Sequence, residues 1–266
     1  MENAQKFRDK LARGQVCLGP VITCADPTIT EALCSLHDFV WIDAEHNAMS
    51  LETVQAHIMA TKGSDVAAIV RVRWNDPALI KPILDIGADG VIVPLVRTVD
   101  DVRRAIAACR YPPEGIRGYG PRRASGYGRL GGPDFTRLAN QTVIVMAQIE
   151  HIDAANAIDE IVQLPGLTGI VLGPQDLSGS MGLMGQTTHP EVVAVMERVI
   201  TAARRAGIFA GQSIGGGPEV QASWVRRGVQ WMSIGNDMSF LMDGARQQAG
   251  GIRQLLAGPA AQGAAQ

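Results

Sequence analysis

Two acidic residues, Glu150 and Asp176, each follow a short apolar run in the sequence. Glu150 closes the run 143–149, and Asp176 comes shortly after the run 169–172. Both runs are typical of parallel strands buried on both faces, and an ionisable group at the end of such a strand has no structural use. A divalent cation, by contrast, needs two or more carboxylates that converge from different strands. The pair therefore predicts a metal site.

A second group of titratable residues, Asp43, Glu45 and His46, directly follows another apolar run. A histidine beside a carboxylate can serve as an acid–base group, because its pKa lies near neutrality. The alternative interpretation is the polar start of a solvated loop. The sequence favours His46 as the acid–base group.

Arg71 and Arg73 alternate with apolar residues in the run 67–72 and just after it. A buried arginine is costly unless it meets an anionic or carbonyl partner. That partner could be a substrate, or it could be Asp43 or Glu45 in an internal salt bridge. The sequence alone leaves both possibilities open.

The Gly173-Pro174 turn before Asp176 would expose backbone N–H groups from Gln175 onward to a small anion, such as a substrate carboxylate beside the metal. Gln148 lies two residues before Glu150 and should share its face of a strand. We therefore expect the side chains of Gln148 and Glu150 to line one cavity.

Three glycines at 215–217 precede a predicted helix, a place where many barrels bind phosphate. A flexible turn is the simpler explanation. A phosphate-binding isomerase that needs no metal remains one alternative function.

The elements that must position these residues alternate regularly along the chain. Apolar runs typical of strands fall near 16–21, 39–43, 67–72, 90–94, 143–149, 169–172, 209–213 and 231–234. Helical apolar spacing fills 28–36, 50–61, 76–86, 99–109, 153–162, 191–206, 218–227 and 239–256. This pattern predicts an α/β fold, a single-domain (β/α)8 TIM barrel over 1–257, with active-site residues at the carboxyl ends of the strands. We expect a long functional or disordered connection near 110–141 and a flexible tail at 258–266.

The composition excludes several classes of function. The 266 residues are 46% hydrophobic and carry a net charge of −2, and no basic stripe suggests a nucleic-acid partner. The four cysteines lack the spacing of a metal motif or of a disulfide framework. The N-terminus is charged, and no apolar run is long enough to span a membrane. These features predict a cytoplasmic protein.

The combination of motifs resembles the HpcH/HpaI aldolase family, the metal-dependent class II pyruvate aldolases. The segments that carry the resemblance extend from Leu18 to about Leu241. They are Ile42-Asp43-Ala44-Glu45-His46, Val70-Arg71-Val72, Trp74-Asn75-Asp76-Pro77, Arg110-Tyr111-Pro112-Pro113-Glu114-Gly115-Ile116-Arg117-Gly118, Gln148-Ile149-Glu150 and Gly173-Pro174-Gln175-Asp176-Leu177-Ser178.

The resemblance implies a homohexamer that binds pyruvate and an aldehyde and uses a divalent magnesium, manganese or cobalt ion. The implied metal ligands are Glu150 and Asp176, and the implied catalytic residues are His46, Arg71, Asp43 and Asp85, the last acting across a subunit boundary. The implied substrate-binding residues are Gln148, Gly173, Pro174, Gln175, Asp176 and Ser125, with Ala124 in the same loop as Ser125.

The expected reaction is the reversible retro-aldol cleavage of a 4-hydroxy-2-oxo acid. The few lysines, Lys6, Lys10, Lys62 and Lys81, fall outside the predicted strand ends, which argues against a Schiff-base aldolase. A related metal-enolate lyase is the main alternative, either an oxaloacetate decarboxylase similar to macrophomate synthase or a CoA-thioester lyase. A non-catalytic binding module is a further alternative.

The sequence also departs from the family pattern. Ala44 replaces a frequent glycine, the segment Asn47-Ala48-Met49 differs from the usual one, and the loop 119–125 is shorter than in some relatives. No predicted metal ligand is affected. The identity of the aldehyde therefore stays open.

Overall fold

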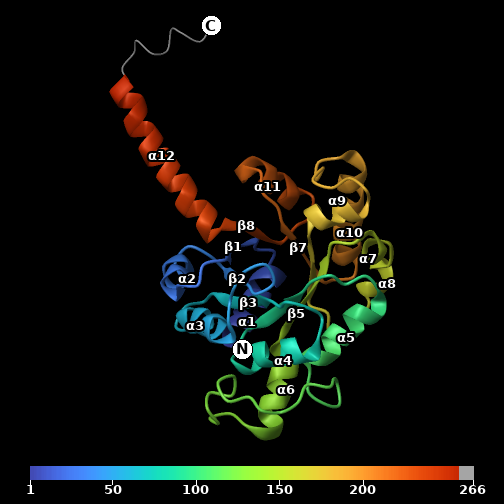
Figure 1. The fold of residues 1–266 in the computed structure, drawn as a ribbon. Coiled ribbons are helices and arrows are strands. Elements are labelled where there is room, and N and C mark those ends of the chain that lie inside the picture. Colours follow the sequence, from blue (N-terminus) through green and yellow to red (C-terminus); the bar gives the residue numbers. More distant parts are fainter. Residues whose placement is uncertain (258–266) are drawn as a thin grey trace.

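The computed structural model describes residues 1–257 and contains a closed barrel of eight strands in the order β1 to β8 (Figure 1). Every neighbouring pair of strands is parallel. The strands are β1 Cys17–Ile22, β2 Phe39–Asp43, β3 Ala67–Arg71, β4 Gly90–Val93, β5 Ile144–Ile149, β6 Gly169–Leu172, β7 Phe209–Ser213 and β8 Trp231–Asn236. The predicted TIM barrel is confirmed. The tail predicted at 258–266 lies outside the described residues.

Helices connect the strands and form the outer layer. They are α1 Glu2–Ala12, α2 Pro27–Cys34, α3 Leu51–Ala60, α4 Pro77–Asp85, α5 Val99–Cys109, α6 Gly132–Thr142, α7 Ile152–Asn156, α8 Ile158–Ile161, α9 Pro174–Ser180, α10 Pro190–Arg205, α11 Gly217–Arg226 and α12 Asp237–Ala257. Each predicted helical stretch contains a helix, although 153–162 divides into the two short helices α7 and α8.

Polar caps fix where several helices begin after the strands. The side chains of Asp26, Ser50, Asp76 and Thr98 each accept a hydrogen bond from a backbone N–H in the first turn of α2, α3, α4 and α5. Such caps satisfy donors that have no partner inside the helix. Each helix therefore starts at the carboxyl end of the barrel and runs back toward the amino end.

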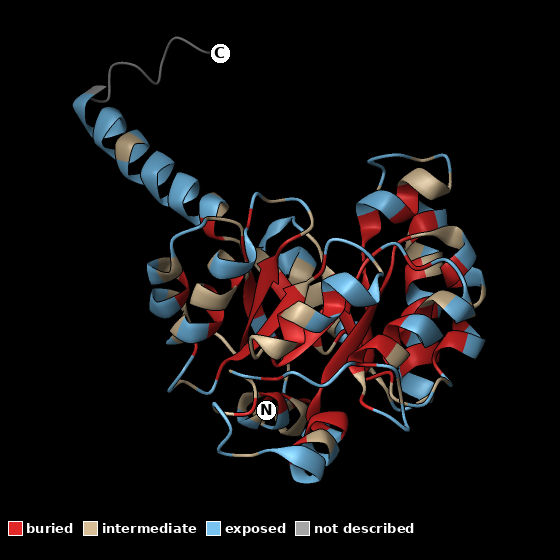
Figure 2. Cartoon of the chain, turned by 60° about the horizontal axis from the view of Figure 1, so that its bottom comes forward, coloured by how far each residue is buried: buried red, intermediate tan, exposed pale blue. Residues whose placement is uncertain are grey.

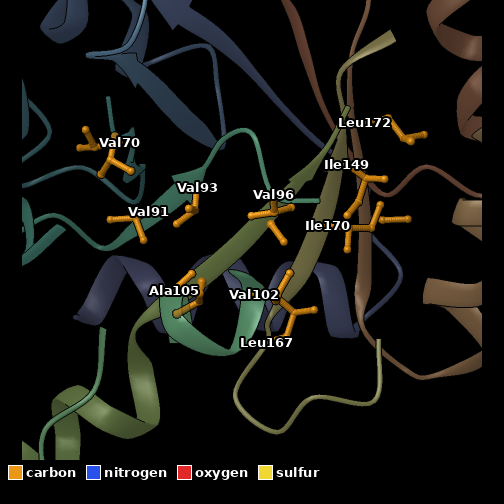
Figure 3. Packing of buried hydrophobic residues seen from close by; sticks show 14 of the residues in the cluster. Val70, Val91, Val93, Val96, Val102, Ala105, Ile149, Leu167, Ile170 and Leu172 are labelled. Carbon is orange, nitrogen blue, oxygen red and sulfur yellow. The ribbon is translucent and has the colours of Figure 1, made fainter. Parts of the chain in front are cut away.

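The barrel has an inner and an outer apolar layer, as expected from side chains that alternate along each strand. Inner positions such as Trp41, Ile69, Met146 and Trp231 belong to one buried cluster. Outer positions pack against the helices, and Figure 3 shows part of this layer. Its members there include Val91 and Val93 of β4, Ile170 and Leu172 of β6, and Val102 and Ala105 of α5.

Helix α1 was not predicted, and it closes the amino end of the barrel. Phe7 is fully buried, and its ring lies 5.6 Å from that of Phe39 and 6.4 Å from that of Trp231, both edge-on. Leu11 joins the same inner cluster. Because the amino end is filled by these side chains, the carboxyl end forms the open mouth of the barrel.

The long connection predicted at 110–141 is partly ordered, because its last third forms α6. Phe135 and Ala139 of α6 are buried with Tyr111 in a small separate core. The glycine-rich composition of the segment concealed this helix. Helix α9 was also missed, because its residues were interpreted as a turn.

The last helix, α12, leaves the barrel instead of packing beside β8 (Figure 1). Its residues from Met238 to Leu256 are almost all exposed, in contrast to the buried strands (Figure 2). Its first residue is nevertheless firmly held, because the Asp237 carboxylate accepts hydrogen bonds from the backbone N–H groups of Thr23 and Cys24. Among residues 1–257, none of the helices combines the length and apolarity needed to cross a membrane.

Candidate active site at the carboxyl end of the barrel

The end of β5 and the loop after β6 lie side by side at the mouth. Ile149 pairs with Leu172, so Glu150 and Gly173 are next to each other one position further along. A Cβ atom on Gly173 would lie 2.8 Å from the Oε2 atom of Glu150. Only glycine fits this close approach. The predicted proximity of Glu150 to the Gly173-Pro174 loop is therefore present.

Glu150 is a buried carboxyl with an unusual pKa. It is 3% exposed, and the backbone N–H of Leu95 donates to its Oε1 atom at 2.6 Å. The Nε2 atom of Gln148 donates to its Oε2 atom, so these two side chains lie together on one face of the strand, as expected. Burial raises the pKa of Glu150 to about 7, and the negative charges of Glu45 and Asp176 contribute to the increase. Several carboxylates therefore crowd one small region.

Arg71, the last residue of β3, is held by two carboxylates at the end of β2 and just after it. Its Nε and Nη2 atoms contact the two oxygens of Asp43 at 2.9 and 2.8 Å, and its Nη1 atom lies 3.1 Å from Glu45 Oε2. The guanidinium also lies 5.2 Å from the centre of the Trp41 ring. The internal salt bridge considered from the sequence is thus present. Since a guanidinium has five N–H donors, Arg71 keeps two for another ligand.

Asp43 has no free oxygen lone pair for a further role. Besides Arg71, it accepts from Asn47 Nδ2 at 2.7 Å and from the Glu45 backbone N–H at 3.1 Å. A carboxylate offers about four acceptor positions, and all are used here. Asp43 therefore orients Arg71 and does not pair with His46.

His46 lies at the rim of the mouth next to Glu45. Its Nε2 atom is 3.5 Å from Glu45 Oε2, and its side chain is 64% exposed. Burial raises the pKa of Glu45, Arg71 lowers it, and the charges of Asp43 and Asp176 raise it again. Within this chain the carboxylate partner of His46 is thus Glu45.

The Gly173-Pro174 segment opens α9, with Gly173 as the N-cap. Gln175 and Asp176 consequently lie in the first turn, where backbone N–H groups have no acceptor inside the helix. The donors expected from Gln175 onward are therefore present, in a helical turn rather than in an irregular one.

Asp85 and Ser125 lie at the other end of the barrel. Helix α4 runs from the mouth to the amino end and finishes at Asp85, whose carboxylate binds Arg117 at 2.7 Å and whose carbonyl accepts from the Ala124 N–H at 3.2 Å. Ser125 is 5% exposed, and its hydroxyl donates to the Pro121 carbonyl at 2.5 Å. The structure does not bring these residues to the Glu150 site of the same chain.

Sequence reasoning missed two features of the mouth. Leu95 adopts a φ of 56°, which is rare for a residue other than glycine, and this conformation directs its N–H to Glu150. Ser213 and Ser233, from β7 and β8, are joined by a hydrogen bond of 2.8 Å between their hydroxyls. Period-two spacing from Gly211 and Trp231 could have placed both serines on the inner face.

The site has the chemistry of an oxygen-ligand cation site. Within residues 1–257, no three His, Cys, Asp or Glu side chains form a complete metal site by themselves. A hard divalent ion can bind through one or two carboxylates together with substrate and water oxygens. Glu150 and Asp176 provide such carboxylates, and a bound cation would favour the charged form of Glu150, which burial and the charges of Glu45 and Asp176 now disfavour. The residues present therefore fit a divalent ion.

Comparison with known proteins identifies the family of this chain. Residues 23–243 match the model of the HpcH/HpaI aldolase/citrate lyase family. The chain belongs to this family. Its members named aldolases are carbon–carbon lyases, and this family member is an enzyme of that class.

Individual relatives agree along nearly the whole chain. The 4-hydroxy-2-oxo-heptane-1,7-dioate aldolase of Salmonella paratyphi C (strain RKS4594) is 35% identical over 263 residues, which cover 97% of this chain and 98% of the relative. An HpcH/HpaI aldolase structure from Desulfitobacterium hafniense DCB-2 has a TM-score of 0.87 at 29% identity, covering 92% of this chain and 96% of that one. Macrophomate synthase has a TM-score of 0.81 at 27% identity, covering 96% of this chain and 91% of that one.

Proposed function

We propose that the protein is a divalent-metal-dependent aldolase that cleaves a 4-hydroxy-2-oxo acid reversibly into pyruvate and an aldehyde. The observation that carries the proposal is the cluster of Glu45, Glu150 and Asp176 at the barrel mouth, with Arg71 in contact with Glu45, where burial and mutual repulsion raise the pKa of Glu150 to about 7. The aldolase names of relatives at 35% identity point to the same reaction.

Glu150 and Asp176 would hold the cation, and magnesium, manganese and cobalt all accept such oxygen ligands. When bound, the cation supplies positive charge that stabilises the negative charge developing on the 2-oxo group. The N–H groups of Gln175 and Asp176 in the first turn of α9 bind the substrate carboxylate. Gln148 orients the Glu150 carboxylate through a hydrogen bond from its side-chain amide.

The remaining residues of the mouth move the proton and hold the charge. His46 removes the proton of the C4 hydroxyl, the C3–C4 bond breaks, and its electron pair enters the pyruvate enolate as the aldehyde leaves. Protonation at C3 then yields pyruvate. Arg71 donates its two unused N–H groups to the oxygen that gains charge, and Asp43 keeps the guanidinium in place.

The decisive experiment follows pyruvate release by metal-stripped protein from 4-hydroxy-2-oxo acids that differ only in their aldehyde half. We expect no release without metal and restored release with magnesium, manganese or cobalt. Release of pyruvate that is independent of any metal would contradict the metal role. The absence of pyruvate with all three metals would favour a thioester lyase or a binding module.

Oxaloacetate decarboxylation is a second candidate, favoured by the similarity to macrophomate synthase. Loss of carbon dioxide from oxaloacetate produces the same pyruvate enolate, so the same residues would support it. Pyruvate release from oxaloacetate and from a 4-hydroxy-2-oxo acid should be compared side by side. A higher kcat/KM for oxaloacetate would make decarboxylation the main activity.

We further propose that the protein acts as a homo-oligomer, with a hexamer as the expected state. Helix α12 supports this, because it carries apolar side chains, among them Met238, Leu241 and Ile252, that residues 1–257 of the same chain leave exposed. In such an assembly Asp85 and Ser125 would serve the mouth of another copy. Light scattering of the wild type and of Leu241→Asp tests this, since the variant should dissociate, and a monomeric wild type would contradict it.

A further inference from the structure

The wall of the mouth beside Gly173 carries a pair of hydroxyl groups that the proposed reaction has not used. Leu172 pairs with Gln212, and Ser213 pairs with Ser233, so Gly173, Ser213 and Ser233 form one row across β6, β7 and β8. Glu150 begins the same row on β5. Adjacent strands lie about 4.8 Å apart, which places the Cα atom of Ser213 roughly 10 Å from that of Glu150.

Both hydroxyls face the interior of the barrel. Trp231 belongs to the inner cluster, and a Cβ atom on Gly211 would overlap its ring, so these residues define the inner face of β7 and β8. Ser213 and Ser233 lie two residues further on and share that face. Their mutual hydrogen bond confirms the placement.

The pair retains hydrogen-bonding capacity toward the mouth. Ser233 is 3% exposed and donates its hydroxyl proton to Ser213 at 2.8 Å. Ser213 is only partly buried, and its own hydroxyl proton meets no acceptor within residues 1–257. A hydroxyl carries one donor and two acceptor positions, so Ser213 can both donate to and accept from a ligand.

The surroundings of the pair are small and uncharged. The described strands β6, β7 and β8 contain no charged residue. Gly173 has no side chain, and the side chains of Glu150 and Gln148 pack closely against it from the β5 side of the row. A neutral polar group fits this wall, whereas a terminal carboxylate would lose its hydration without meeting a cation on these strands.

We propose that Ser213 and Ser233 form the subsite for the aldehyde half and select an aldehyde that bears a hydroxyl group. This rests on the proposed aldolase function. Pyruvate loses a C3 proton, its C3 atom forms a bond to the aldehyde carbon, and the aldehyde oxygen gains a proton. The aldehyde carbon becomes C4 of the product, and the hydroxyl group on the neighbouring carbon, C5, faces Ser213.

The test measures condensation of pyruvate with glycolaldehyde and with propanal, which differ only by a hydroxyl in place of a methyl group. Succinic semialdehyde represents an aldehyde that ends in a carboxylate. We expect kcat/KM of the wild type to be highest for glycolaldehyde. Ser213→Ala and Ser233→Ala should each lower the ratio of glycolaldehyde to propanal by about fivefold, the effect of losing one neutral hydrogen bond.

Matched variants separate selectivity from general damage. Ser35→Ala removes an exposed serine at the end of α2, at the amino end of the barrel, and should leave the ratio unchanged. Ser213→Thr keeps the hydroxyl and should keep the preference. Exchange of the pyruvate C3 protons in deuterated water requires no aldehyde and should be equal in all these variants, whereas a structural role of the pair would lower exchange and both condensations together.

The outcomes distinguish this subsite from the underlying activity. An unchanged ratio in both alanine variants, or a wild-type preference for succinic semialdehyde or propanal, would overturn the subsite while the aldolase function stands. Failure of the wild type to exchange pyruvate protons with any metal would instead overturn the aldolase function.

Discussion

The two ends of the barrel are built from the same strands but have opposite chemistry. The inner face of β2 begins with Phe39, continues with Trp41 and finishes with Asp43. At the amino end the rings of Phe39, Phe7 and Trp231 pack together, and at the carboxyl end Asp43 binds Arg71. A few residues along one strand thus separate a packed aromatic core from a charged site.

This difference shows how stability and function are divided along the barrel axis. Each edge-on aromatic pair contributes about 0.5–1.5 kcal/mol beyond the burial of its surface. The carboxyl end has the reverse effect, because burial raises the pKa of both Glu45 and Glu150, which means that their charged forms are disfavoured. Substitutions at the two ends should therefore separate the two properties.

The largest effect is expected from Glu150→Gln, which keeps the shape of the side chain and removes its charge. Metal-dependent pyruvate release should fall by at least about 1,000-fold, since several kcal/mol of charge stabilisation are lost with the cation. The melting temperature should stay the same or rise, because a buried charge is removed. Calorimetric titration with manganese and turnover assays check both properties.

Glu160→Gln provides the control for this variant, because Glu160 is an exposed glutamate on α8. It should behave as the wild type. Full manganese affinity in Glu150→Gln would remove Glu150 from the metal site.

At the amino end, Phe7→Ala should lower stability and leave turnover unchanged, the reverse of Glu150→Gln. Removal of this fully buried ring should lower the free energy of unfolding by about 3 kcal/mol, the lower range for such truncations. Turnover per folded molecule should remain near that of the wild type. Urea unfolding and active-site titration measure the two quantities, and a large loss of turnover in the folded fraction would show that the ends are coupled.

The sequence predicted the barrel well because apolar runs and capping residues are local signals. The eight strands lie where the pattern placed them, and the helices that Asp76 and Thr98 cap begin close to their predicted starts. Helix α1 was missed because its burial depends on packing under the barrel, which involves strands distant in the sequence. Helix α6 was missed because glycine and proline residues flank its apolar positions.

The site was only partly predictable for a similar reason. The proximity of Glu150 to Gly173 follows from strand order, which the βα repeat implies. The pairing of His46 with Glu45, and the contacts of Asp43 with Arg71 and Asn47, depend on side-chain geometry that spacing cannot give. The left-handed backbone conformation of Leu95 could not be predicted, because leucine rarely adopts it.

A smaller effect than at Glu150 is expected from His46→Ala. The variant should retain its metal affinity and lose about 100-fold in kcat, the range for a lost general base, equivalent to about 2.7 kcal/mol. His37→Ala, at the amino end of the barrel, is the matched control and should keep its turnover. Near-normal turnover of the His46 variant would exclude it from proton transfer and leave Glu45 as the next residue to test.

The smallest effect concerns the pH dependence of stability, which should also divide the two ends. In the metal-free protein, burial raises the pKa of Glu150 from its ordinary value of 4.5 to about 7, so between these values the folded state holds a proton that the unfolded state releases. Its contribution to stability is complete below about pH 4.5 and is lost as the pH rises through 7. From pH 5 to pH 8 the metal-free wild type should therefore lose on the order of 2 kcal/mol relative to Glu150→Gln. Phe7→Ala should show the same pH dependence as the wild type, because the packing that it loses contains no titratable group.

Urea unfolding of the three proteins at pH 5 and pH 8 checks this prediction. If the free energy of unfolding changes equally with pH in the wild type and in Glu150→Gln, then burial of the Glu150 charge does not destabilise the folded protein.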